Sequence, residues 1–228
     1  MSQARASSSL ASVVFALYLA TLVAAPLWYG GAGPLAQALF VSLFALLAMA
    51  TVFVADAPDP AEPAAQALRI PAVCYAGAVA WALFQALAPA PEWLAAPVWR
   101  LASDTLGVDF GARVSVSPWR TLGGVALLLG YALVFWTAFR FSRSARLAQR
   151  GVATLFYAGA AYAAWALVDH FAGWNRVLFE AKDPYALENL RGFASGTFRN
   201  RDHFAAFCGV GYFCGLADRK STRLNSSH

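Results

Sequence analysis

Charged residues are scarce in this sequence. Aspartate, glutamate, lysine and arginine make up 13% of the 228 residues, whereas about a quarter is usual for a soluble domain. Hydrophobic residues make up 60%, and the mean hydropathy is +0.53. This composition excludes an ordinary soluble domain and indicates a membrane protein.

Residues that bind metals and nucleotides are also few. There are three histidines, one of them at the last position, and the three cysteines have no paired spacing typical of a metal site or a disulfide framework. Neither a phosphate-binding Walker loop nor a dinucleotide-binding glycine pattern occurs. The sequence therefore predicts no metal and no cofactor.

The net charge is +5 and the isoelectric point is about 9.4. Such a basic balance is typical of nucleic-acid binding only when the basic residues cluster on one face of a domain. Here they fall in short segments between apolar runs. We expect the partners to be membrane lipids and anionic lipid-linked molecules, not nucleic acid.

Apolar runs follow one another along the whole chain. A helix needs about 20 apolar residues to cross a bilayer, and five runs reach that length. The predicted spans cover residues 9–28, 35–54, 70–88, 119–139 and 152–171, with a shorter sixth at 203–217. The predicted fold class is therefore all-α, a polytopic transmembrane helical bundle of about six spans. A cleavable signal peptide is the alternative for the first run, since small residues follow its apolar core.

The segments between the spans carry further expectations. Residues 56–69 contain three prolines and are predicted to be a loop. Residues 92–106 mix tryptophan, leucine and charge, which suits a short helix at the membrane interface or a lid over a groove. In the sixth span, Gly211 and Gly215 form a pair of small residues four apart, which would let a neighbouring helix approach closely.

Two segments bear on topology and chain ends. Arg140, Arg143, Arg146 and Arg150 are predicted to lie in one short loop without acids, which by the positive-inside rule is cytoplasmic. The N-terminus is then cytoplasmic, and the loop before the sixth span is external. The polar tail at 221–228 continues no motif and is predicted to be non-native. On that view the chain is the N-terminal fragment of a longer protein.

Residues 190–207 place charged and amide side chains directly before an apolar segment. Arg191, Arg199 and Arg201 lie here near two glycines. Guanidinium groups match phosphate oxygens in pairs, and glycine lets backbone N–H groups come close to a ligand. The pattern suits a phosphate or pyrophosphate. The alternative is a basic loop that only contacts lipid headgroups.

Within this stretch, residues 196–205 have the sequence GTFRNRDHFA. It resembles the Gly-Thr-Phe-x-Asn-(Arg/Pro)-Asn-x-(aromatic)-Ala signature of the O-antigen ligase and polymerase family of bacterial membrane glycosyltransferases. The region 115–150 is also similar to the family in form. Two positions depart from the signature: Asp202 stands where the family usually has asparagine, and Arg199 stands where it usually has a small or apolar residue.

The resemblance implies a reaction and its partners. The family transfers a glycan from undecaprenyl pyrophosphate to a hydroxyl of lipid A core, of another glycan or of a protein. The implied location is the bacterial inner membrane, with the motif loop in the periplasm. In the family a later external loop bearing a histidine is thought to activate the acceptor. That loop is absent from this sequence, so we expect the chain alone to be inactive. The catalytic residue is expected in the missing C-terminal part of the protein, and its identity is unknown.

Individual roles follow from the same resemblance. Arg191 would hold the pyrophosphate, and Arg199 and Arg201 would share that role. His203 is a weak candidate for a base or hydrogen-bond donor.

From the residue types alone, Asn200 and Thr197 are predicted to cap the sixth helix. A cap there would turn the positive end of the helix toward a bound anion.

Two other functions compete with the glycosyltransferase. The first is a transporter or flippase-like protein, in which the arginines line a path for an anionic lipid-linked substrate. The second is a non-catalytic anchor or assembly subunit. Neither is excluded by the sequence.

Overall fold

The structure is a computed structural model of the chain. It describes residues 2–28, 31, 33–54, 62–174, 176–177, 180–181, 193–198 and 200–225. The chain divides into two units, Met1–Asp56 with Val134–His228, and Ala57–Leu133. Each unit is described by itself.

Long apolar helices dominate both units, as predicted. Within the described residues five stretches are long and apolar enough to cross a membrane, because runs of alanine, leucine and valine meet the length a bilayer requires. They are α1 (Ser2–Ala24) with the short helix η1 (Ala25–Leu27), α2 (Pro34–Val54), α3 (Pro63–Ala67) with α4 (Arg69–Leu87), α6 (Pro118–Ser142) and α7 (Ala145–Ala172). The chain is a multi-pass membrane protein with a helical bundle fold.

The last helix, α9 (Arg201–Asn225), contains the predicted sixth span but is not among these five stretches. Its apolar run is short and ends at Asp218, Arg219 and Lys220. A sixth crossing therefore stays a prediction. The helix also continues into the segment that the sequence analysis treated as a tail.

Two predicted loops prove to be partly helical, and the helix predicted at 92–106 is shorter than expected. The prolines of 56–69 do not prevent α3, because Pro63 stands at the first helical position, where no N–H is needed. In 92–106 the helix α5 (Pro97–Leu106) also begins at a proline, five residues later than predicted, and ends at Gly107. The predicted arginine loop is wrong as well: only Arg143 lies in the turn between α6 and α7. Arg140 lies in the last turn of α6, and the other two arginines lie in α7.

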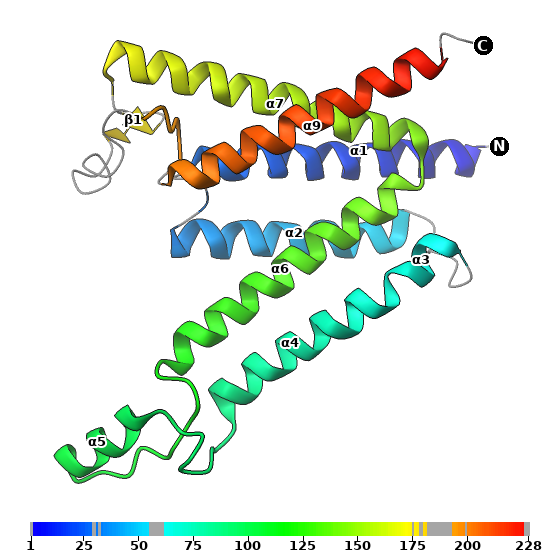
Figure 1. Cartoon of the computed structure of the whole chain (residues 1–228). Helices are drawn as coiled ribbons and strands as arrows, with labels where there is room; N and C mark the ends of the chain where they lie inside the picture. The colour runs from blue at the N-terminus through cyan, green and yellow to red at the C-terminus, as the bar shows by residue number, and fades with distance from the viewer. Residues whose placement is uncertain are drawn as a thin grey trace. The chain divides into compact units, whose positions relative to one another are not determined.

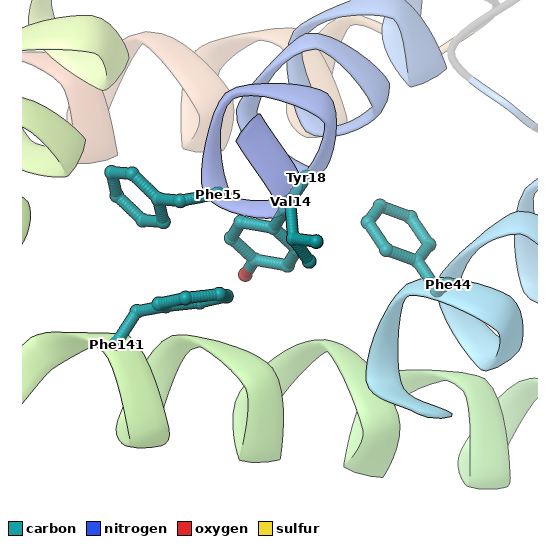
Figure 2. Packing of buried hydrophobic residues seen from close by; sticks show 5 residues of the cluster. All are labelled: Val14, Phe15, Tyr18, Phe44 and Phe141. Atoms are coloured by element: carbon teal, nitrogen blue, oxygen red, sulfur yellow. The ribbon is translucent and has the colours of Figure 1, made fainter. Parts of the chain in front are cut away.

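The core of the first unit joins α1, α2 and the end of α6. Figure 2 shows Val14, Phe15 and Tyr18 of α1 between Phe44 of α2 and Phe141 of α6. The ring centroids of Phe15 and Phe141 are 5.0 Å apart, and those of Tyr18 and Phe44 are 5.8 Å apart. The Tyr18 hydroxyl donates a hydrogen bond to the Val134 carbonyl at 3.1 Å, so this buried hydroxyl is satisfied.

In the same unit α7 and α9 lie side by side and run antiparallel (Figure 1). Gly159 and Gly211 face each other where they meet, and a Cβ atom built on either glycine would lie 3.1 Å from the other's Cα. A Cβ on Gly215 would meet the ring of Phe156. The predicted role of Gly211 and Gly215 in close helix packing is confirmed.

Between α7 and α9 the structure describes one small antiparallel pairing. Strand β1 (Arg176–Val177) pairs with β2 (Glu180–Ala181), with Arg176 opposite Ala181. The sequence analysis predicted only a loop here. The pairing is too short to alter the all-helical character of the fold.

Candidate functional site

The signature residues form a compact turn against the first unit's helices. We call residues 193–198 together with Asn200 the motif turn. Ser195 and Thr197 are each only 1% exposed. The Thr197 hydroxyl donates a hydrogen bond of 2.7 Å to the carbonyl of Pro26 in η1. A residue far along the sequence is therefore tied to the end of the first helix by a buried hydrogen bond, which is costly to break.

Aromatic packing fixes the turn on a second side. Phe198 is buried, and its ring lies 6.2 Å from that of Tyr162 on α7 and 5.5 Å from those of Phe204 and Phe207 on α9. Tyr162 in turn donates its hydroxyl to the Val23 carbonyl at 2.7 Å. Tyr162 therefore links α1, α7 and the motif turn.

Gly196 explains why the signature has a glycine at this point. Its φ is +52°, in the left-handed region that side chains disfavour. A Cβ on Gly196 would also lie 3.1 Å from the Cβ of Ala166 on α7. Both the backbone conformation and the available space require glycine.

Asn200 caps α9, as predicted. Its Oδ1 accepts a hydrogen bond from the backbone N–H of Asp202 at 2.8 Å, and its carbonyl accepts one from Phe204 at 3.2 Å. The capping role predicted for Thr197 is wrong, because its hydroxyl donates to Pro26 instead. Burial against η1 takes the threonine side chain away from the helix end.

The described charged residues of the signature lie at the start of α9. The Arg201 guanidinium stacks 4.2 Å from the centre of the Phe193 ring, and its Nε is 3.8 Å from the Asp202 carboxylate. Arg201 is half exposed, and Asp202 and His203 are exposed. The geometry leaves the guanidinium open to a ligand while the aromatic ring orients it.

Two predicted substrate-binding residues, Arg191 and Arg199, lie outside the described residues. Their roles stay predictions. Of the five predicted site residues, the structure brings Asn200, Arg201 and His203 together at the first turn of α9.

A groove of about 330 Å³ opens beside the motif turn. Its walls are almost entirely apolar and come from the end of α1 with η1, from α7 and from the motif turn. The lining residues are Val23, Leu27, Ala158, Ala161, Tyr162, Trp165 and Thr197. The groove suits a hydrocarbon chain, since its polar hydroxyls are already bonded to backbone carbonyls.

Asp169 is a buried acid that was not among the predicted site residues. It is only 3% exposed, although it lies in the last turns of α7. The buried residues of α7 are Ala158, Gly159, Tyr162, Ala166 and Asp169, which share one helix face. The sequence gives no sign of this face, because α7 is apolar on nearly every side.

Across the described part of the chain, no group of three histidine, cysteine, aspartate or glutamate residues is arranged to hold a metal ion. No protein-family model matches the chain, and neither a curated protein nor a solved structure matches it. The function is therefore inferred from the signature and from the geometry of its residues.

Proposed function

We propose that the protein takes part in glycan transfer from a polyprenyl pyrophosphate, as an O-antigen ligase-like or polysaccharide polymerase glycosyltransferase. One observation carries the proposal: a half-exposed arginine, oriented by an aromatic ring, lies at the capped N-terminus of α9, four residues after Thr197, which lines an apolar groove. A charged head and a long hydrocarbon tail are the two parts of such a donor.

The charged end of the site favours an anion. The N-terminus of a helix carries a partial positive charge, and Arg201 adds a full one. Asp202 lies beside Arg201 and weakens the local positive field, but its ion pair is exposed and contributes little. A pyrophosphate bearing several negative charges would draw the guanidinium away from this weak partner.

In the proposed reaction the bond between the sugar's anomeric carbon and the pyrophosphate oxygen breaks, and a bond to the acceptor oxygen forms. The acceptor hydroxyl loses its proton to a base, and the lipid pyrophosphate leaves with increased negative charge. Arg201 would stabilise that charge as it develops. Among the other predicted residues, Arg191 and Arg199 would add to the same field, and His203, two residues after Arg201 on α9, is the candidate for the base.

The proposal can be tested by donor binding to the 228-residue chain in nanodiscs, with undecaprenyl pyrophosphate as the probe. Arg201→Gln should weaken binding about tenfold, because a charge-assisted hydrogen bond contributes about 1.5–3 kcal/mol. Asp202→Asn should tighten binding, because it removes the competing carboxylate. Opposite changes in affinity at two adjacent residues distinguish an electrostatic effect from misfolding.

Arg150→Gln is the matched control, since it removes an exposed arginine near the start of α7, away from the motif turn. Equal losses for Arg150→Gln and Arg201→Gln would mean that only overall charge matters, and the proposed site would be wrong. Orientation gives an independent check. A cysteine at the exposed position His203 should react with an impermeant maleimide from the periplasmic side, and reaction only from the cytosol would exclude the proposed chemistry.

A further inference from the structure

The second unit contains an apolar surface on a segment between two spans. We call residues 88–117 the α5 connection. It follows α4 and precedes α6, and within this unit those two helices run antiparallel, with the connection at one end of the pair (Figure 1). The Tyr75 hydroxyl of α4 donates to the Leu128 carbonyl of α6. Because α4 and α6 belong to membrane-crossing stretches, their shared end lies at one membrane surface.

Hydrogen bonds hold α5 close to that surface. The Ser115 N–H donates to the Gln85 carbonyl near the end of α4 at 3.0 Å, and the Ala96 N–H donates to the Arg113 carbonyl at 2.8 Å. The Trp99 indole N–H donates to the Ser115 carbonyl at 2.9 Å. The start of α5 is thus tied to the residues that enter α6, and the helix cannot move far from the ends of the spans.

One face of α5 exposes apolar side chains. Val98 and Leu101, three residues apart and therefore on one side of the helix, are both exposed, Leu101 by 68%. Arg100 and Asp104 are four residues apart and form a separate polar edge. Trp93 on one flank and Trp119 on the other are 84% and 83% exposed. The exposed face of α5 is therefore apolar, and exposed tryptophans precede and follow the helix in the chain.

The bilayer is the occupant that these observations favour. Exposed apolar side chains also occur on the membrane-crossing stretch that leads into the connection, where Trp81 and Leu87 are exposed. Tryptophans gather where hydrocarbon meets headgroups. The polar side of α5 opens instead onto a pocket of about 330 Å³ lined by Glu92, Arg100, Ser103 and Asp109 among others. Water and headgroups can fill this pocket, so only the opposite side needs an apolar cover.

We infer that α5 is an amphipathic helix that lies in the boundary between lipid headgroups and acyl chains, with Val98 and Leu101 facing the acyl chains. The helix fixes the depth of the ends of α4 and α6 in the bilayer. Its polar edge places Arg100 among the headgroups, where a guanidinium binds phosphate oxygens. The sequence left open whether this helix lies at the interface or covers a groove as a lid, and the inference favours the interface. It does not depend on the proposed glycan transfer.

Spin-label accessibility tests the inference directly. In a chain with its three cysteines replaced by alanine, single cysteines at Val98, Leu101, Arg100 and Asp104 would be labelled and measured in nanodiscs that hold one copy. The ratio of oxygen to water-soluble nickel collisions should be several-fold higher at the first two positions, because oxygen concentrates in hydrocarbon. Similar nickel access at all four positions would overturn the inference in favour of a helix in water.

Protection at Val98 and Leu101 that appears only in vesicles with many copies would also overturn it, since a second chain would then be the cover. The native sequence offers a second measurement if the cysteine-free chain does not fold. Quenching of tryptophan fluorescence by lipids brominated near the headgroup should decrease after Trp93→Phe, and no decrease would contradict the inference.

Discussion

The motif turn and the α5 connection both lie between long helices but are held in place differently. The motif turn leads into α9, and the α5 connection joins α4 to α6. The motif turn buries Ser195, Thr197 and Phe198 against helices that are distant in sequence. In the α5 connection, all of whose residues are described, only Ala96 is buried, and its backbone hydrogen bonds join residues of the connection to one another or to the adjoining end of α4.

This difference has a physical consequence. A turn whose polar groups are satisfied by the protein core has one geometry, which a site for charged substrates requires. A connection that exposes apolar side chains depends on its surroundings for their burial. The first should therefore respond strongly to small changes in shape, and the second should tolerate them.

The largest difference in stability between the two regions is expected at two glycines with positive φ, Gly196 in the motif turn and Gly107 in the α5 connection. Gly196→Ala should lower the free energy of unfolding by about 2–4 kcal/mol, because backbone strain adds to a clash with Ala166. Gly107→Ala at the end of α5 introduces similar strain, but no described atom lies within 4 Å of the new Cβ. We expect it to cost about 1 kcal/mol. Unfolding midpoints in detergent measure both.

Equal midpoints for the two glycine variants would contradict the idea that the motif turn is packed and the α5 connection is open. Gly77→Ala provides a baseline, since this glycine lies in a helix and has no described atom within 4 Å of a built Cβ. That change should be neutral or slightly stabilising.

Two threonines sharpen the comparison at the level of single hydrogen bonds. Thr197→Val keeps the shape but leaves the Pro26 carbonyl without this donor in a buried place, which should cost about 2 kcal/mol. Thr105→Val on α5 removes a hydroxyl that donates to the Leu101 carbonyl at 2.7 Å on an exposed surface. Its effect should stay within about 0.5 kcal/mol. A larger loss at Thr105, measured by the same unfolding assay, would reverse the assignment of the two regions.

The cap of α9 is expected to contribute less than the buried contacts. Asn200→Ala should cost about 1 kcal/mol, because the N–H of Asp202 loses its acceptor. Asn200→Asp keeps an acceptor and should restore the stability. Hydrogen exchange of peptides covering the first turn of α9 would report the change locally. If both variants exchange like the native chain, the cap does not hold the helix end.

Much of the fold could be predicted from composition and run length. The five spans appear because each depends on local apolar content, which a single sequence displays directly. The extra helices at Pro63 and Pro97 were missed or misplaced for the opposite reason: proline signals a break, although at the first helical position it begins a helix. The cap at Asn200 was predictable because capping is local.

The rest of the site could not be predicted, because it depends on contacts between distant residues. Nothing near Thr197 in the sequence indicates that its partner is Pro26, and from the sequence alone a hydroxyl this close to a predicted helix could equally serve as a cap. The groove likewise needs the end of α1 and the middle of α7 together.

A small effect is also expected for a side-chain hydrogen bond within the α5 connection itself. Trp99→Phe removes the indole donor to the Ser115 carbonyl while the ring under Arg113, 6.0 Å away, stays aromatic. The bond is only partly buried, so water can replace the donor and the loss should be about 0.5–1 kcal/mol. Trp99→Phe should therefore speed hydrogen exchange in peptides from the connection. Trp93→Phe is the control: it changes an exposed ring that has no hydrogen bond among the described contacts, so exchange should stay unchanged. A loss at Trp99 as large as that at Thr197 would mean that the α5 connection is organised as tightly as the motif turn, and the contrast between a packed site and a lipid-dependent connection would no longer hold.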